Sequence, residues 1–373
     1  MSRKIVRVET IPLALPLRVP FKIANGAPRS SVEVLLVRLH ADDGTTGVGE
    51  TQAWRRQGSS ETLASLRAVI EQHFAPRLVG RSPFDLAAIM RDLEATIYHS
   101  LYAQAAVGDA LYDLQGKLLG VPVYQLIGGR ARDAVPTCWT LTMKDSLEET
   151  LEGAEQAHAQ GYRSFTVKIG LDAAEDVRNV AAVRERLGDQ VIIRVDANAG
   201  MTFDGARALL KKLEPYGIDA AEQPLAIGDF DGAAELARRV DIPIMADESV
   251  ATTHDLLDLI RRRAANAIHT KVAKNGGLWG TRRLWTLAEA GGIRIFPGNH
   301  PSTSIGTASV LHLAAAWSGP LLEGPFPIGL TVYTDDVVTE PLRMNGHLVP
   351  VPDRPGWGYE LDEQKISRLR AGA

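Results

Sequence analysis

164-SFTVKIGLDAAEDVRNVAAVRERLG-188 combines a short run with strand alternation and a longer run with helical spacing. In the first run Phe165, Val167 and Ile169 share one face, whereas Thr166 and Lys168 share the other. The second run is amphipathic and ends at Gly188, where a left-handed C-cap is expected. The stretch therefore predicts one strand followed by one helix, and its repetition along the chain predicts the fold.

Strand-like runs recur from about residue 134 onward. Their starts lie near Val135, Ser164, Val191, Ile218, Pro243, Ala267, Arg294 and Pro320. Amphipathic stretches lie between them, such as 146–161 and 202–217, with Ser146 and Thr202 as candidate N-caps. Seven or eight strand–helix units predict an α/β fold in which a parallel sheet closes into a (β/α)8-type barrel, rather than an open doubly wound sheet.

The chain divides into three parts by pattern. Residues 1–128 contain alternating runs such as 33–45 and helical stretches such as 103–120, which predict an α+β capping domain. Residues 129–326 are the expected TIM barrel, which is the catalytic domain. The segment 327–373 has Pro- and Gly-rich turns and is expected to return to the capping domain.

Composition narrows the class of protein. The chain has 373 residues, 45% hydrophobic and 23% charged, with a formal net charge of −4. The chain has no long run of one charge sign, so nothing predicts a nucleic acid or a membrane surface as partner. It also has no apolar run long enough to predict a signal peptide or a membrane span. The single cysteine, Cys138, excludes an internal disulfide framework and a cysteine cluster for zinc. We expect a cytoplasmic protein.

Charged side chains stand at the ends of five consecutive predicted strands. The second strand ends in Lys168, the next three end in Asp196, Glu222 and Asp247, and the sixth carries Lys271. The C-terminal ends of barrel strands converge on one mouth, so we expect these side chains to meet there. Their neighbours at the same ends are Asn198, Gln223, Glu248 and His269.

The three carboxylates would repel one another unless a cation lay between them. Oxygen ligands without an obvious Cys or His set favour Mg²⁺, with Mn²⁺ as the alternative. Lys168 and Lys271 lie one strand before and one strand after the trio, so they should face a metal-bound carboxylate from opposite sides. This pattern predicts removal of the proton α to a substrate carboxylate through a metal-stabilised enediolate, with one lysine taking the proton and the other able to deliver one.

Each charged residue also has a structural interpretation. A single aspartate at a strand end is more often a helix N-cap or an ion-pair partner, and Lys168 could simply pair with Asp196. Five charges at five consecutive strand ends are costly to bury without a function, which favours catalysis. Two other classes remain open: a Schiff-base barrel enzyme with Lys168 or Lys271 as nucleophile, and a barrel that binds without catalysing.

The runs TVKIG, RVDANAG, AEQPL, MADES and TKVAKNGG together resemble the enolase superfamily, specifically its muconate lactonizing enzyme subgroup. The resemblance extends over nearly the whole chain. It implies an enolase-like modified barrel and a homo-oligomer, and it disfavours the mandelate racemase type, which uses a His–Asp dyad. It also implies roles for matching residues: Mg²⁺ ligands at Asp196, Glu222 and Asp247, and an acid/base pair at Lys168 and Lys271.

Departures from the subgroup pattern concern the substrate. Thr166 stands where relatives often have a lysine, and Ser302 stands where muconate cycloisomerases tend to have a glutamate. The resemblance implies a muconate-cycloisomerase-like isomerase of a small carboxylate. The alternatives are a racemase or epimerase of an N-acyl amino acid, dipeptide or proline derivative, or a dehydratase. Candidate substrate contacts are Thr166, Asn299, His300 and Ser302, together with Lys22, Trp54, Arg55 and Arg56 in segments that match the superfamily's lid loops.

Overall fold

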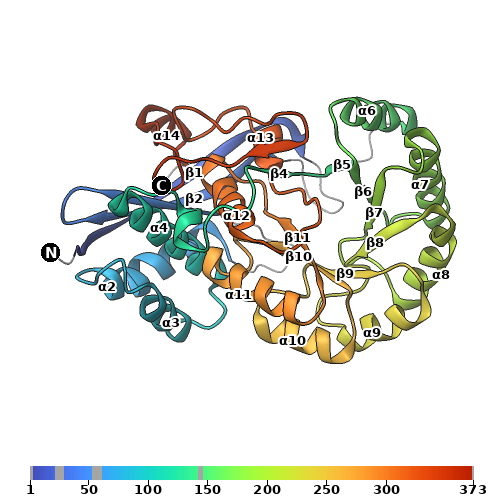
Figure 1. Ribbon diagram of the computed structural model, residues 1–373, viewed down its shortest axis with the longest axis horizontal. Coiled ribbons are helices and arrows are strands. Elements are labelled where there is room, and N and C mark those ends of the chain that lie inside the picture. The colour runs from blue at the N-terminus through green and yellow to red at the C-terminus, as the bar shows by residue number, and fades with distance from the viewer. Residues whose placement is uncertain (1–2, 22–28, 53–60, 142–145, 372–373) are drawn as a thin grey trace.

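The computed structural model describes residues 3–21, 29–52, 61–141 and 146–371. An antiparallel sheet with its helices lies at one end of the molecule, and a curved parallel sheet wrapped by helices lies at the other (Figure 1). The predicted barrel and α+β capping domain are thus confirmed as fold classes. None of the helices within these ranges is long and apolar enough to cross a membrane.

The capping domain is built on three antiparallel strands in the order β1 (Ile5–Phe21), β2 (Arg29–Ala41) and β3 (Thr46–Gln52). Its helical segments are α1 (Leu63–Ala68), the π-helical η1 (Val69–Phe74), α2 (Ala75–Leu78), α3 (Leu86–Thr96) and α4 (Leu101–Leu119). Helix α4 packs directly on β3. A Cβ at Gly49 would lie 2.0 Å from the Ala106 carbonyl oxygen, so only glycine permits this close approach.

The barrel sheet has seven parallel strands in the order β11-β10-β9-β8-β7-β6-β5. They are β5 (Trp139–Leu141), β6 (Ser164–Lys168), β7 (Ile192–Asp196), β8 (Ile218–Glu222), β9 (Ile244–Ala246), β10 (Ala267–Lys271) and β11 (Arg294–Gly298). Phe165 and Val167 on β6, and Ile169 directly after it, join the apolar core between sheet and helices, as their shared face predicted.

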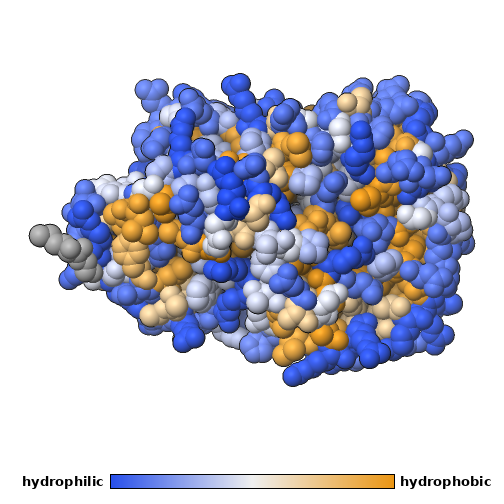
Figure 2. All heavy atoms as spheres, viewed as in Figure 1, coloured by the Kyte–Doolittle hydropathy of each residue, from blue (hydrophilic) through white to orange (hydrophobic). Residues whose placement is uncertain are grey.

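Among the described residues, seven helices follow the barrel strands. They are α6 (Leu147–Ala159), α7 (Ala173–Leu187), α8 (Phe203–Leu213), with the 3₁₀ turn η2 (Glu214–Tyr216) after it, α9 (Phe230–Arg239), α10 (Thr253–Arg262), α11 (Gly277–Ala290) and α12 (Ser304–Ala316). The hydroxyls of Ser146 and Thr202 accept hydrogen bonds from the Glu149 and Gly205 amides at 3.2 and 3.3 Å, which confirms both N-caps. The outer rim over α7 and α8 is mostly hydrophilic in Figure 2, as expected for the solvent face of amphipathic helices.

Two predicted strand positions were wrong. The run near Val135 is β4 (Ala134–Pro136), which pairs antiparallel with β12 (Leu348–Pro350), so the first barrel strand is β5. The run near Pro320 forms no strand, and Pro320 itself has no amide to donate to a ladder. Extended chain fills that gap: the Leu322 amide donates to the Ile295 carbonyl at 2.8 Å, and the Thr137 hydroxyl donates to the Gly324 carbonyl at 2.7 Å.

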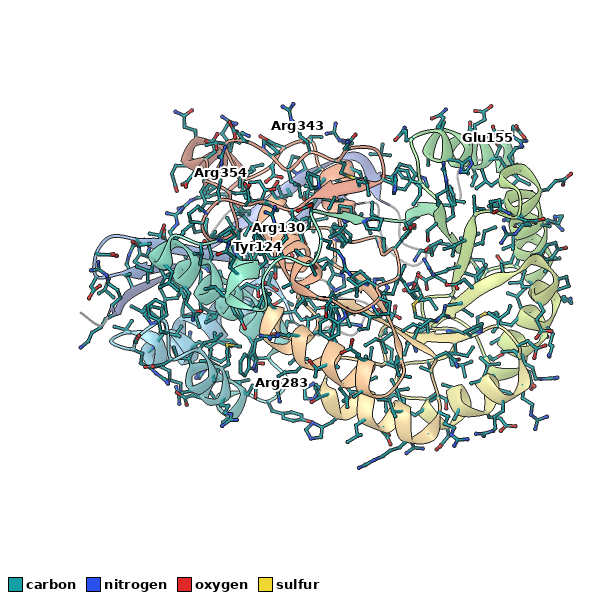
Figure 3. The ribbon with its side chains drawn as sticks, viewed as in Figure 1. Tyr124, Arg130, Glu155, Arg283, Arg343 and Arg354 are labelled. Atoms are coloured by element: carbon teal, nitrogen blue, oxygen red, sulfur yellow. The ribbon has the colours of Figure 1, made fainter. Side chains whose placement is uncertain are left out.

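The passage from the capping domain to the barrel is held by two side chains near its start. After α5 (Val123–Leu126), the guanidinium of Arg130 donates to the Tyr124 hydroxyl at 2.8 Å and lies 4.8 Å from the centre of its ring. Both side chains lie in the middle of the molecule, between its two regions, in Figure 3. This contact fixes the direction in which the chain leaves α5.

The last part of the chain contacts the capping domain. It contains α13 (Ile328–Val332), β12 and α14 (Glu363–Leu369). The Trp357 indole donates to the Val48 carbonyl at 2.8 Å, and the Trp357 amide donates to the buried Asp113 carboxylate at 2.8 Å. The Ala371 amide donates to the Pro12 carbonyl at 3.1 Å. These bonds connect the tail to β1, β3 and α4.

Candidate active site

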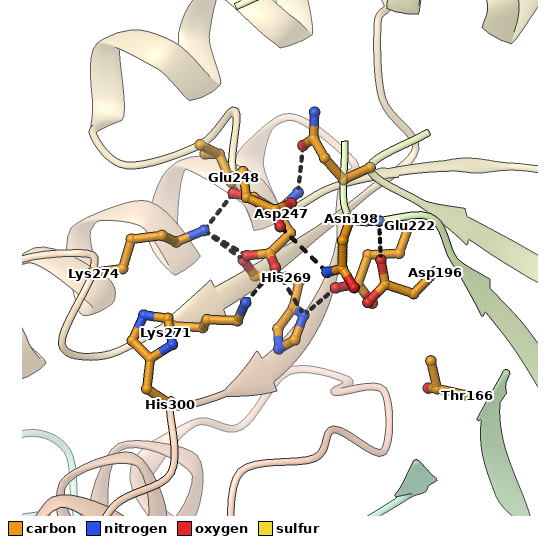
Figure 4. A network of polar contacts seen from close by, with 12 residues as sticks. Thr166, Asp196, Asn198, Glu222, Asp247, Glu248, His269, Lys271, Lys274 and His300 are labelled. Atoms are coloured by element: carbon orange, nitrogen blue, oxygen red, sulfur yellow. Dashed lines mark hydrogen bonds and ion pairs between the residues drawn. The ribbon is translucent and has the colours of Figure 1, made fainter. Parts of the chain in front are cut away.

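Strand register brings the predicted charged residues to one end of the barrel, and Figure 4 shows Asp196, Glu222, Asp247 and Lys271 there. Lys168 on β6 is the Cα partner of Asp196 on β7, which is in turn the partner of Glu222 on β8. Asp247 directly follows β9, and Lys271 ends β10. The five side chains therefore stand at one level around the C-terminal ends of adjacent strands, as the sequence predicted for the mouth of a barrel.

Glu222, Asp247 and His269 form a compact buried group. One ligand atom from each lies within 4.8 Å of the other two, which suits a metal ion. The His269 Nδ1 lies 2.8 Å from the Glu222 carboxylate and 3.8 Å from that of Asp247. Burial lowers the pKa of His269 to about 3, so the ring is neutral and its Nδ1 shares a hydrogen bond with the Glu222 carboxyl group. The sequence named His269 as a neighbour of Lys271 but gave it no role.

Asp196 stands somewhat apart from that group in its contacts. Its carboxylate accepts from the Lys168 ammonium and, at 2.8 Å, from the Asn198 amide. Asn198 itself has a positive φ of 45° and also accepts from Lys168 at 2.8 Å. A lysine, rather than a histidine, is thus the cationic partner of this carboxylate.

The pKa shifts reflect crowding of like charges. Burial, followed by the Asp196 and Asp247 carboxylates, raises the pKa of Glu222 well above its usual value. Burial also opposes ionisation of Asp247, but Lys271 and Lys274 outweigh it and hold the Asp247 pKa well below its usual range. A cation among these oxygens would relieve the repulsion, and hard oxygen donors suit Mg²⁺. The residues present therefore fit a divalent metal ion.

The two predicted acid/base lysines lie on opposite sides of the carboxylates. Strands β7, β8 and β9 separate Lys168 on β6 from Lys271 on β10. Lys168 pairs with Asp196, whereas Lys271 pairs with Asp247. Burial opposes charge on both lysines, but the neighbouring carboxylates prevail and raise both pKa values. The Lys168 side chain is 37% exposed and that of Lys271 is 7% exposed, so Lys168 has more access to solvent.

Gln223 and Glu248 contact the loops next to the Asp247 and Asp196 carboxylates. The Gln223 side-chain oxygen accepts from the Asp247 and Ser249 amides at 3.1 Å, which fixes the loop after β9. One Glu248 carboxylate oxygen accepts from the Asn198 side-chain amide at 3.4 Å. The other is buried without a hydrogen-bond partner among the described residues. Burial, then Asp247, raises the pKa of Glu248 to about 8.

The candidate substrate contacts lie in different surroundings. The Thr166 hydroxyl is buried 3.8 Å from the Cys138 sulfur, away from the polar network in Figure 4. The Ser302 hydroxyl accepts from the Gln52 side chain at 2.7 Å, and the Asn299 side chain donates to the Gly306 carbonyl at 2.9 Å. Both therefore support the loop after β11. Lys22, Trp54, Arg55 and Arg56 lie outside the described residues.

His300 connects the barrel to the capping domain. Its Nε2 lies 2.8 Å from the hydroxyl of Tyr102 on α4, and the two rings stack with centroids 5.8 Å apart. Burial, then the charge of Lys271, lowers the pKa of His300 well below its usual value, so the ring is neutral. A neutral imidazole beside Lys271 can hydrogen-bond a substrate without adding charge to the site.

Lys274 is a member of the network that the sequence did not single out. Its ammonium is 1% exposed and lies 2.7 Å from the Asp247 carboxylate. The sequence signal for Lys274 is its position three residues after Lys271. In the structure, the residues around it are buried as well. Because Lys274 stands in the turn after β10, strand alternation gave no reason to aim it at the site.

Comparison with known proteins covers both regions of the chain. Residues 5–128 match the family model described as "Mandelate racemase / muconate lactonizing enzyme, N-terminal domain", and residues 149–365 match "Enolase C-terminal domain-like". The chain is 34% identical to muconate cycloisomerase 1 of Pseudomonas putida over 95% of its length and 94% of the relative's. It is 32% identical to the N-succinyl-L-Arg/Lys racemase of Bacillus cereus over 98% of both chains. The structure of the Pseudomonas fluorescens muconate lactonizing enzyme complexed with muconolactone superimposes with a TM-score of 0.94, 32% identity and full coverage of both chains.

Proposed function

Because the chain belongs to the mandelate racemase/muconate lactonizing enzyme family of the enolase superfamily, in which its relatives are isomerases, we propose that it is a Mg²⁺-dependent isomerase of a small carboxylate. The proposed chemistry is transfer of the proton α to a substrate carboxylate: a racemase, or the opening of a lactone, removes this proton first, whereas lactone formation from a muconate delivers it last. The observation that carries the proposal is the placement of Lys168 and Lys271 on opposite sides of three buried carboxylates. The preferred reaction is muconate-cycloisomerase-like.

Asp196, Glu222 and Asp247 are the proposed metal ligands, with Mn²⁺ as a possible substitute for Mg²⁺. When bound, the ion would stabilise the negative charge that the substrate carboxylate gains as it becomes an enediolate. His269 would orient Glu222 through its Nδ1 hydrogen bond, and its neutral state adds no charge to the site. Gln223 and Asn198 would hold the loops that carry Asp247 and Asp196.

The lysines supply the proton transfers. One amine takes the α-proton from its face of the substrate, and the opposite ammonium can deliver a proton to the other face. Asp196 and Asp247 are placed to hold these ammonium groups in position between steps. Candidate contacts that select the substrate are Thr166, Asn299, His300, Ser302, Lys22, Trp54, Arg55 and Arg56.

A racemase or epimerase of an N-acyl amino acid, dipeptide or proline derivative is the second candidate. The 32% identity to an N-succinyl-L-Arg/Lys racemase favours it, since that relative matches almost the whole chain. Ser302 points the same way, because muconate cycloisomerases tend to have a glutamate at this place. Dehydration by β-elimination would start from the same enediolate and is the third candidate.

A screen of carboxylates in D₂O tests the proposal. Muconates, N-acyl amino acids, dipeptides and proline derivatives would be incubated with the full chain and Mg²⁺, and α-deuterium followed by mass spectrometry. Lactone formation would identify a cycloisomerase, whereas deuterium incorporation without net conversion would identify a racemase. EDTA should abolish either activity. Activity that survives EDTA, together with borohydride trapping of a covalent adduct, would instead support a Schiff-base enzyme.

The domain boundaries, the location and the assembly state of the protein are proposed as well. We propose division at residues 128 and 326, a cytoplasmic location and a homo-oligomer, the last by analogy with the family. Light scattering of the full chain would test the assembly state, and a monomeric mass would contradict that part of the proposal.

A further inference from the structure

We propose that Lys274 is a positioning residue that fixes the Asp247 carboxylate, so that Mg²⁺ affinity depends on a lysine that contacts neither metal nor substrate. The inference rests on the proposed metal site. Lys274 follows β10 by three residues and is almost wholly buried. A buried ammonium is costly unless several acceptors surround it, and the acceptors of Lys274 indicate its role.

The Lys274 ammonium donates to three oxygens, two of which belong to Asp247. It lies 2.7 Å from the Asp247 carboxylate oxygen Oδ1 and also binds the Asp247 main-chain carbonyl. Its third acceptor is the His269 carbonyl at 3.3 Å. One ammonium that binds both the side chain and the main chain of the same residue restricts rotation of that side chain about χ1. The carboxylate is therefore held in one rotamer.

Hydrogen bonds of the β9–β10 ladder do not fix the position of Asp247. The ladder between β9 and β10 has only two Cα pairs, and Ala246 opposite Ile268 is the last. Asp247 lies just beyond it. The Gln223 side chain accepts from its amide at 3.1 Å on the β8 side. Lys274 connects its carbonyl and carboxylate to His269 on the β10 side, where the ladder has ended.

The two lysines bind different oxygens of the same carboxylate. Lys271 donates to Asp247 Oδ2, whereas Lys274 donates to Oδ1. If Lys271 turns toward a substrate, Lys274 still compensates the charge on Asp247. The position of the carboxylate then does not depend on where the proton-transferring lysine is. Lys274 can thus hold Asp247 in place while Lys271 transfers a proton.

Positioning and electrostatics predict opposite effects of removing this charge. An ammonium near a cation site repels the cation, so its loss alone should tighten Mg²⁺ binding. Loss of the fixed rotamer should weaken binding, because the carboxylate must then be ordered by the metal itself. The direction and the size of the change therefore decide between the two roles.

Isothermal titration calorimetry of Mg²⁺ on the full-length Lys274→Met variant tests the proposal. We expect an affinity at least tenfold weaker than that of the wild type. A matched control is Lys117→Met, because Lys117 also pairs with a fully buried carboxylate, that of Asp113 at 2.7 Å, but on α4. The control should lose stability without losing Mg²⁺ affinity. Lys274→Gln keeps side-chain N–H donors and should recover part of the affinity.

The outcomes are separable. A wild type that does not bind Mg²⁺ would contradict the proposed function itself. A wild type that binds, with a folded Lys274→Met variant that loses less than tenfold or binds more tightly, would overturn the positioning role alone. If Lys274→Met does not fold by circular dichroism, the same tenfold criterion applies to Lys274→Gln. Failure of both variants to fold would assign Lys274 to folding and also overturn the proposal.

Discussion

The barrel mouth and the junction with the capping domain both bury carboxylates, but they satisfy them in different ways. At the mouth, Asp196 and Asp247 bind lysine ammonium groups. At the junction, Glu50 on β3 accepts from the Thr303 amide at 3.0 Å and the Gly306 amide at 3.1 Å, at the start of α12. Asp109 on α4 likewise accepts from an amide at the start of α11, that of Leu278, at 2.8 Å.

The difference separates the acids that join the two regions from the proposed metal ligands. Main-chain amides at a helix N-terminus are fixed donors that favour a negative charge, so the carboxylates they bind act as joints between the two regions. Ammonium groups on long side chains can move and exchange protons, so the carboxylates they bind can be released to a metal or a substrate. Burial alone does not distinguish the two sets, and neither does an ammonium partner alone, because Asp113 at the junction also pairs with Lys117. What the junction carboxylates share is a main-chain amide donor from a distant segment of the chain.

The largest expected effect tests the mobile partners at the mouth. Lys168→Ala or Lys271→Ala should lower turnover by about 10²–10⁴-fold, the usual contribution of a general acid or base. Mg²⁺ binding should be largely preserved, because Lys274 still holds Asp247 and the Asn198 amide still holds Asp196. Steady-state kinetics on the substrate found in D₂O, with calorimetry for Mg²⁺, measure both quantities. Full activity in both variants would show that these ammonium groups are structural after all.

The sequence predicted the mouth well because its geometry is local. Strand alternation aims Lys168 away from the apolar face of β6, and register then places Asp196 and Glu222 beside it. Lys274 was missed because it projects from a turn, where neither helical nor strand period applies. The strand expected near Pro320 was wrong. The run is apolar, but its first residue is a proline that cannot donate a ladder hydrogen bond.

The junction could not be predicted from local pattern. Glu50 and Thr303 are 253 residues apart in the chain, and nothing near either residue indicates the other. The same holds for Asp113, whose carboxylate accepts from the amides of Val48 and Trp357, both at 2.8 Å. Such contacts depend on how the two regions dock, which only the folded structure shows.

The second prediction concerns Asp113, a buried carboxylate that joins the two regions. Asp113→Ala should destabilise the protein by about 3–5 kcal/mol, because it leaves the Lys117 ammonium and two buried amides without their acceptor. Urea unfolding followed by circular dichroism measures the loss. The folded variant should still bind Mg²⁺ as the wild type does. Loss of Mg²⁺ affinity in a fully folded variant would mean that junction and mouth are not independent.

The third prediction concerns pH at the junction. Burial raises the pKa of Glu50 from its ordinary 4.5 to about 7, although hydrogen bonds from Thr303 and Gly306 oppose the shift. The folded state then holds its proton more tightly than the unfolded state. The contribution of Glu50 to stability is thus full below about pH 4.5 and is lost as pH rises through about 7, by up to about 3 kcal/mol.

Comparison of the wild type with the Glu50→Gln variant isolates the contribution of Glu50 to stability. The free energy of unfolding of the wild type, measured in urea between pH 4.5 and 8, should fall relative to that of the variant as pH rises. The variant lacks the titrating group, so the other acids of the protein cancel in the difference. Parallel curves for the two proteins would show that Glu50 keeps its charge throughout, held by its amide donors.

The smallest effect is expected at a carboxylate near the surface, Glu235, whose side chain is 34% exposed and which has as many lysine or arginine partners as Asp247. Glu235 accepts from Arg238 at 2.6 Å and from Arg239 at 2.7 Å on the outer surface of α9. Because water and salt screen these pairs, Glu235→Gln should change neither the urea midpoint nor the Mg²⁺ affinity measurably. Asp247 and Glu235 then differ in burial, not in partner number. A loss as large as that of Asp113→Ala would mean that paired charge, rather than buried charge, holds the structure together.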